Sequence, residues 1–266
     1  MVDPPVRRPP PSIFGAADLA AAVTSLGVTT SDALFVHSSL RGALRMEGRT
    51  GTEKMATIGA GLVAAVPEGT LLMPTFTYSF CEDREFDVER SPSRVGALGE
   101  WFRALPDVRR TRDPIFSCAL RGALPEAWEQ RLLRAHDVDC FGEHSVFAYL
   151  RERRAKLLFL GVGFQYATYV HHVEQRLRVP YRYPKPFSGV VVDGGRRIEV
   201  TATYLVRRLD GSVEPSFERL AAALTDAGAA RSTTLPDGPA LLLVDVEAIE
   251  PAVRAGLEGD PRYLLR

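Results

Sequence analysis

The chain has 266 residues, of which 45% are hydrophobic and 25% are charged, an ordinary composition for a globular protein with a substantial core. Its 33 Lys and Arg residues balance its 33 Asp and Glu residues, so charge gives no support for nucleic-acid or membrane binding as its main role. Three widely spaced cysteines fit neither a disulfide scaffold nor a zinc site, and no apolar run resembles a membrane span or signal peptide. We therefore expect a cytoplasmic protein that binds no metal, membrane or nucleic acid.

Helical and strand patterns alternate along most of the chain. Residues 1–12 carry five prolines, which predicts a mobile tail before a single domain at 13–266. The alternation that follows predicts an α/β fold, a three-layer sandwich with a mostly parallel central sheet. In chain order we expect a helix at 16–27, a strand at 33–39, a helix at 53–66, a strand at 70–77, a helix at 94–106, strands at 115–122 and 156–164, a helix at 168–178 and, near the end, a helix at 215–227, a strand at 240–246 and a helix at 247–257.

One stretch, residues 189–203, breaks this alternation. Two β-rich runs flank Asp193-Gly194-Gly195, which is a strong signal for a hairpin. We therefore expect an antiparallel excursion there.

Polar residues follow three of the predicted strands where each strand ends. They are His37-Ser38-Ser39, Thr75 to Tyr78, and Gly161 to Gly163 running on to Thr168. Ligands of open α/β sheets bind beyond the carboxyl ends of the strands, and hydroxyls with free backbone amides suit phosphate or pantetheine. Ser and Thr at such positions can equally cap the next helix. None of the nucleotide-binding fingerprints is present.

The helix predicted at 168–178 carries a second candidate constellation. With Thr168 as N-cap, His171 lies in the first turn and Glu174 one turn later on the same face. Glu174 can then accept a hydrogen bond from one ring nitrogen and leave the other to accept a proton. His172 points about 100° away around the helix. The alternatives are a structural His beside a helical ion pair, or a zinc site, for which the spacing is wrong.

Six segments, taken together and in order, resemble the aminoglycoside 3-N-acetyltransferase family, which is distinct from the GNAT fold. They are FVHSSL (35–40), GTLLMPTFTYS (69–79), SPSRVGALGEWFRALPDVRR (91–110), DPIFSCALRG (113–122), CFGEHSVF (140–147) and LLFLGVGFQYATYVHHVEQ (157–175).

The resemblance implies transfer of an acetyl group from acetyl-CoA to a primary amine, without a metal. Its T-x-x-H-x-x-E motif falls on Thr168, His171 and Glu174, with His171 as general base and Glu174 as its partner. Contacts to coenzyme A are implied for the polar strand ends, namely His37, Ser38, Ser39, Leu40, Thr75 and Thr77.

The acceptor side departs from the family pattern. Asp113 stands where many members have histidine, and Val173 stands where some carry an acidic residue. The residues that we assign to the acceptor are Tyr78, Asp113, Arg178 and Arg182, in a region made basic by Arg176 and Lys185. Polycationic aminoglycosides need carboxylates around them. The sequence therefore favours a less cationic or even anionic amine and a biosynthetic rather than a resistance role.

Three other functions compete with this one. The same fold could use a longer acyl group or one held by an acyl carrier protein. It could be a binding module for coenzyme A that has lost its activity. A metal-dependent hydrolase could use His171, His172 and Glu174.

Overall fold

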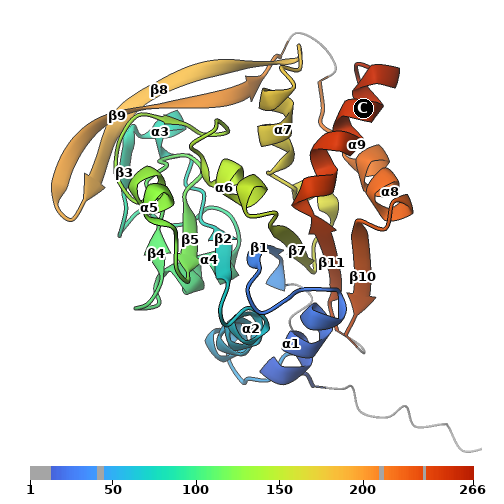
Figure 1. Ribbon diagram of the computed structural model, residues 1–266. Coiled ribbons are helices and arrows are strands. Elements are labelled where there is room, and N and C mark those ends of the chain that lie inside the picture. Colours follow the sequence, from blue (N-terminus) through green and yellow to red (C-terminus); the bar gives the residue numbers. More distant parts are fainter. Residues whose placement is uncertain (1–12, 41–44, 210–212, 236–237) are drawn as a thin grey trace, which may run out of the picture.

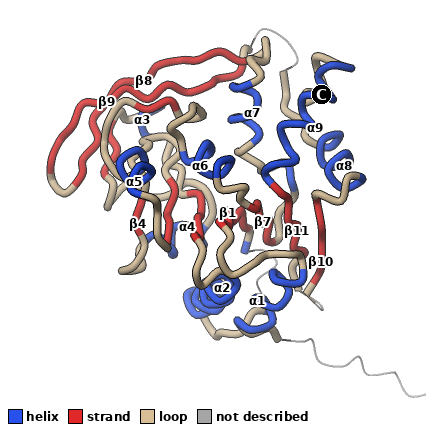
Figure 2. Tube along the Cα trace, viewed as in Figure 1, coloured by secondary structure: helices blue, strands red, loops and turns tan. Residues whose placement is uncertain are grey.

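The computed structural model describes residues 13–40, 45–209, 213–235 and 238–266, so the tail predicted at 1–12 lies outside the described residues. The protein is a mixed α/β fold (Figures 1 and 2). Across the described ranges, no helix combines the length and apolarity needed to cross a membrane.

A seven-stranded sheet forms the centre of the molecule. Its middle strands β7, β1 and β2 pair in parallel, whereas β11 and β5 join them antiparallel and β10 and β4 extend the edges antiparallel. The sheet predicted as mostly parallel is therefore mixed, with its parallel pairs confined to the centre. In spatial order the strands are β10 (Ala230–Thr234), β11 (Ala240–Asp245), β7 (Lys156–Leu160), β1 (Ala33–Ser38), β2 (Thr70–Pro74), β5 (Cys118–Arg121) and β4 (Arg109–Arg110).

Both faces of this sheet are buried. Successive side chains of a strand point to opposite faces, so Leu34 and Val36 join one apolar cluster while Phe35 joins another. Burial of each such side chain stabilises the fold by about 1.5–3 kcal/mol. The first cluster includes residues of α1 (Ala16–Ser25), α2 (Gly51–Ala65) and α4 (Ala97–Arg103); the second includes α6 (Val146–Glu152), α7 (Val170–Arg176), α8 (Glu218–Asp226) and α9 (Val246–Gly259).

A smaller second sheet flanks the central one. Its core is a hairpin of β8 (Arg182–Asp193) and β9 (Arg196–Arg207), which arches outward in Figure 1. Gly194 and Gly195 have φ values of 56° and 79°, the left-handed conformation that a two-residue hairpin turn requires. The predicted hairpin at 189–203 is confirmed but is longer, and it belongs to this sheet together with β3 (Glu85–Asp87) and β6 (Val138–Asp139).

Among the described residues, four short helical elements escaped the sequence patterns, because none completes enough turns to show a periodicity. They are α3 (Ser79–Glu82), α5 (Glu126–Leu132), α6 and the 3₁₀ turn η2 (Phe164–Tyr166).

Candidate active site

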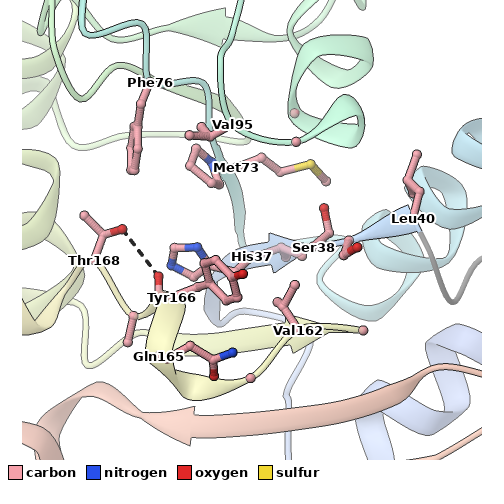
Figure 3. A pocket seen from close by; sticks show the side chains of 18 of the residues that line it. His37, Ser38, Leu40, Met73, Phe76, Val95, Val162, Gln165, Tyr166 and Thr168 are labelled. Carbon is pink, nitrogen blue, oxygen red and sulfur yellow. Dashed lines mark hydrogen bonds between the residues drawn. The ribbon is translucent and has the colours of Figure 1, made fainter. Parts of the chain in front are cut away.

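A cavity of about 1220 Å³ opens at the carboxyl ends of the three parallel strands. Its walls come from the end of β1, the end of β2 and the loop after β7, which is where ligands bind in folds of this kind. The volume exceeds the usual 300–1000 Å³ or so of a small-molecule site and suits an extended ligand. Figure 3 shows this cavity, and the predicted residues that line it are His37, Ser38, Ser39, Leu40, Tyr78, Thr168 and His171.

His37 forms part of the cavity wall as a neutral ring. It stacks on Phe159 with ring centroids 5.1 Å apart and meets Phe35 edge-on at 5.0 Å. Only 6% of the residue is exposed, and burial lowers its pKa to about 3. Its Nε2 is buried without a hydrogen-bond partner among the described residues.

Thr75 and Thr77, predicted as coenzyme A contacts, do not line this cavity. The Thr75 hydroxyl donates to the carbonyl of Ser117 at 3.0 Å, and the Thr77 hydroxyl donates to the carbonyl of Pro114 at 2.7 Å. Both side chains are fully buried. They fasten the segment after β2 to a neighbouring loop, which gives both a structural role, and their contact with coenzyme A stays a prediction.

Tyr78 lines the cavity from an unusual backbone conformation. Its φ is 55°, in the left-handed region that costs a non-glycine residue about 1–2 kcal/mol. The ring meets Phe76 and Phe116 edge-on, and burial raises the pKa of the phenol to about 12. Tyr78 is therefore a neutral hydrogen-bonding group beside the cavity.

Asp113 does not line this cavity. One of its oxygens, Oδ1, accepts from the backbone amides of Ile115 at 2.8 Å and Phe116 at 2.9 Å, the turn that an Asp before Pro114 favours. The structure gives Asp113 a turn-forming role, and its contact with the acceptor stays a prediction.

His171 and Glu174 form the central pair. On α7 the His171 Nδ1 lies 2.6 Å from Glu174 Oε2, and the Glu174 side chain has no exposed surface. The Tyr181 hydroxyl donates to Oε1 at 3.1 Å. Arg182 Nε lies 2.6 Å from Oε2 as an ion pair, although its N–H is not aligned as a hydrogen bond. Burial alone would raise the pKa of Glu174, but His171, Arg182 and Tyr181 outweigh it and lower that pKa.

The charge of Glu174 fixes the tautomer of His171. A carboxylate only accepts hydrogen bonds, so the ring must carry its proton on Nδ1 and keep the lone pair on Nε2. The ring meets Phe141 and Phe217 edge-on, with centroids 5.5 and 6.1 Å away, and these contacts hold its orientation. The arrangement is that of an oriented general base.

His171 also borders a second cavity, of about 440 Å³. The two cavities share this one residue in their linings, so a ligand in each would meet at His171. The second lining consists of His171, Arg182, Tyr183, Lys185, Tyr204, Val206, Arg207, Leu209 and Pro215.

Arg182 and Arg178, both predicted to contact the acceptor, lie in different places relative to the second cavity. Arg182 lines the second cavity, but it pairs with Glu174 and its side chain is only 5% exposed. Arg178 is exposed and lies outside both linings, and its contact with the acceptor stays a prediction.

Thr168 lines the first cavity but is not the helix cap. The residue preceding α7 is Tyr169, and the Thr168 hydroxyl donates instead to the carbonyl of Tyr166 at 3.4 Å (Figure 3). Its own carbonyl accepts from the His171 amide at 3.0 Å. The 3₁₀ turn before Thr168 moves the start of the helix by one residue.

His172 has separate surroundings, as its position on the helix predicts. It is fully buried and its Nδ1 lies 2.7 Å from the carbonyl of Phe141. The ligand set of a metal-dependent hydrolase, His171 with His172 and Glu174, is therefore not brought together. Within the parts of the chain that the structure describes, no three His, Cys, Asp or Glu side chains form a metal-binding group.

Several contributors to the site were not predicted. Tyr181 supports Glu174, Phe217 packs against His171, and Tyr204 with Arg207 lines the second cavity. Phe217, Tyr204 and Arg207 lie in segments without a recognisable motif, so only the fold could place them. Tyr181 lies beyond the end of the helix predicted at 168–178, so helical spacing gave no indication of its role.

Comparison with known proteins agrees with this geometry. The family model described as aminoglycoside 3-N-acetyltransferase matches residues 35–255. The aminoglycoside N(3)-acetyltransferase IV of Salmonella is 33% identical over 186 residues, which span 69% of this chain and 67% of that protein.

Solved structures extend the match to nearly the whole chain. The apoenzyme of aminoglycoside acetyltransferase AAC(3)-IVa superposes with a TM-score of 0.75 at 27% identity, covering 97% of this chain and 94% of the other. AAC-IIIb in its binary complex with CoASH gives 0.78 at 25% identity, covering 93% and 97%. These matches lead to one assignment. The chain belongs to the aminoglycoside 3-N-acetyltransferase family and is an acyltransferase.

Proposed function

We propose that this protein transfers an acetyl or other short acyl group from coenzyme A to the primary amine of an amino sugar or related compound, with His171 as general base. The observation that carries the proposal is the position of the His171–Glu174 pair at the junction of two cavities. A base at such a junction can act on an amine from one side and a thioester from the other.

The first cavity is the proposed donor site. It is the larger of the two, it lies at the carboxyl ends of the parallel strands, and AAC-IIIb binds CoASH on the same fold. Ser38, Ser39 and Leu40 line it after β1, where hydroxyls and backbone amides suit the amides and phosphates of coenzyme A. We assign these three residues, with His37, to the donor.

The second cavity is the proposed acceptor site. A variant of AAC(3)-IVa has been crystallised with apramycin, so a relative at 26% identity takes an aminoglycoside. In this chain the cavity holds about 440 Å³ and its wall includes the base.

The chemistry follows from the tautomer. The neutral amine nitrogen bonds to the thioester carbonyl carbon while His171 Nε2 accepts one of its protons, and Glu174 stabilises the imidazolium that forms. The carbon–sulfur bond then breaks, and the same proton moves from His171 to the departing sulfur. The products are an amide and the free thiol of coenzyme A. The Thr168 hydroxyl, in the donor lining, is our candidate donor to the developing oxyanion.

The cysteines have no part in this step. Cys118 and Cys140 are buried, and burial raises the pKa of both thiols, so neither supplies a thiolate nucleophile. Cys81 is exposed but lies outside both linings. Acyl transfer is direct.

The test is thiol release from acetyl-CoA with a panel of amines, using wild type and His171→Gln. Loss of a general base lowers kcat by about 10²- to 10⁴-fold. His144→Gln is the matched control, because His144 is an exposed histidine outside both linings. A His171→Gln rate equal to wild type, above the uncatalysed background, would remove His171 as the base. Propionyl-, butyryl- and longer acyl-CoA in the same assay determine the donor length.

A further inference from the structure

We propose that the acceptor carries an anionic group, a phosphate or carboxylate, and that Lys185 and Arg207 recognise it. This inference rests on the proposed function, because it takes the second cavity as the acceptor site.

The second cavity is cationic along one wall. Lys185 comes from β8 and Arg207 from β9, and both line the cavity that contains His171. Arg182 and Arg207 are direct partners in the hairpin register, so two cationic residues face each other across the strands. Like charges in this position destabilise a hairpin unless an opposite charge lies near.

Among the described residues, only one of the three cationic side chains in that wall has a carboxylate partner. Arg182 has Glu174 as its ion-pair partner, whereas the described residues offer no carboxylate partner to Lys185 or Arg207. The Lys185 ammonium instead lies 5.1 Å from the centre of the Phe187 ring.

Two other arginines near α7 and the hairpin are neutralised by carboxylates. Arg176, at the end of α7, pairs with Glu143 and with Glu250, the latter at 2.8 Å, and lies outside the cavity lining. Arg112 holds Asp193 at 2.9 Å near the hairpin turn. Uncompensated positive charge therefore remains where the acceptor binds.

The lining also lacks the groups that a polycation needs. No Asp or Glu side chain is among the described residues of the second cavity. A ligand with several ammonium groups would meet Lys185 and Arg207 as like charges, whereas a phosphate or carboxylate would gain charge-assisted hydrogen bonds. Tyr183 and Tyr204 add ring surface for a sugar, and about 440 Å³ is near the lower end of small-molecule sites. The chemical class that fits is a small amino sugar or amine with one anionic substituent.

Glucosamine and glucosamine 6-phosphate test this directly, because they share the amine and differ by the phosphate. With acetyl-CoA, we expect kcat/KM for the phosphate to exceed that for glucosamine by about tenfold or more at low ionic strength, and the ratio to fall with added salt. Apramycin serves as the polycationic probe and should be the poorest acceptor.

Charge-removing variants assign the effect to residues. Lys185→Gln and Arg207→Gln should each reduce the ratio of the two kcat/KM values by roughly threefold, and together bring it close to one. Arg196→Gln is the control, because Arg196 is an exposed arginine on the same strand outside the cavity, and it should keep the wild-type ratio.

The outcomes separate the two proposals. A ratio near one, a preference for apramycin, or a ratio unmoved by both variants would overturn the anionic acceptor, while His171-dependent acetylation would still support the proposed function. Failure to acetylate any of the three amines above the His171→Gln background would count against the proposed function and against this inference with it.

Discussion

Replacing Glu174 with glutamine keeps the shape of the side chain and removes the charge that His171 and Arg182 face. The stability cost comes from Arg182, whose side chain is 5% exposed and loses its ion-pair partner. Removing one partner of a buried ion pair leaves the other charge unpaired and lowers the unfolding free energy by about 3–5 kcal/mol. For a chain of this size, about 2–4 °C per kcal/mol gives a fall in Tm of roughly 6–20 °C.

The rate cost comes from the imidazolium that forms during acyl transfer. Two unit charges about 4 Å apart interact by about 4 kcal/mol at an effective dielectric constant of about 20, which corresponds to about 10³-fold in rate. The amide oxygen can still accept from His171 Nδ1 and so retains part of this effect. We therefore expect kcat to fall by about 30- to 1000-fold.

A double variant separates the two costs. Glu174→Gln with Arg182→Met removes the stranded charge, so Tm should recover while kcat at saturating substrates stays low. A wild-type kcat in Glu174→Gln, measured by thiol release on folded protein, would refute the role of Glu174 in supporting the base.

The pH dependence gives an independent check on the same residue. The pKa of Glu174 is lowered from its ordinary 4.5, so the stabilisation by its carboxylate is complete above about pH 4.5 and is lost as pH falls through the folded value. The difference in unfolding free energy between wild type and Glu174→Gln should therefore narrow below pH 4.5. A constant difference down to pH 3 would contradict the lowered pKa.

Three further substitutions test other features. His37 has a pKa of about 3 instead of 6.5, so the unfolded state binds its proton first and wild type should lose about 2 kcal/mol of unfolding free energy between pH 6.5 and 4.5. In urea unfolding, His37→Asn should show a shallower loss, and equal slopes would exclude burial as the cause. Thr77→Val leaves the carbonyl of Pro114 without its donor and should cost about 1–3 kcal/mol without changing the KM for acetyl-CoA, whereas a raised KM would make Thr77 a ligand contact. Gly161→Ala should raise the KM for acetyl-CoA, because Gly161 has a φ of 67° and a Cβ there would lie 2.9 Å from the carbonyl of Ser39. The control is Gly194→Ala: Gly194 is also left-handed but has open space around it at the hairpin turn, so this change should lower only Tm.

The elements around the site were predictable because burial leaves a clear pattern. β1 and β7 lie between two apolar clusters, so their sequences are continuously hydrophobic until the strands end at the cavity. The pairing of His171 with Glu174 followed from helical spacing, since residues three apart share a face.

Polar residues after the strands were harder to interpret. A hydroxyl or carboxylate in a loop can turn to a ligand or to a backbone carbonyl or amide, and the sequence is the same in both cases. Ser38 and Ser39 line the cavity, whereas Thr75, Thr77 and Asp113 bond to the neighbouring backbone. Only the path of the surrounding loops decides between these outcomes.

The hairpin was underestimated for a different reason. Pro184 and Pro186 lie within β8, and proline normally argues against a strand. Backbone nitrogens two residues apart in a strand point to the same side, so those of Pro184 and Pro186 share one side of β8. On the side away from β9, β3 pairs with β8 only from Val190 to Val192. The prolines therefore occupy a stretch with β9 on one side and no described strand on the other, where a missing N–H costs nothing.

The two cavities that share His171 also constrain the order of events in turnover. With the proposed assignment, donor and acceptor each occupy their own cavity and both cavities border His171, so neither has to leave before the other arrives. Initial rates measured against one substrate at several fixed levels of the other should give intersecting reciprocal lines, the pattern of a ternary complex, and not the parallel lines of a ping-pong enzyme. A dead-end complex of enzyme, free coenzyme A and acceptor should also form, because coenzyme A competes with acetyl-CoA for the donor cavity and leaves the acceptor cavity open.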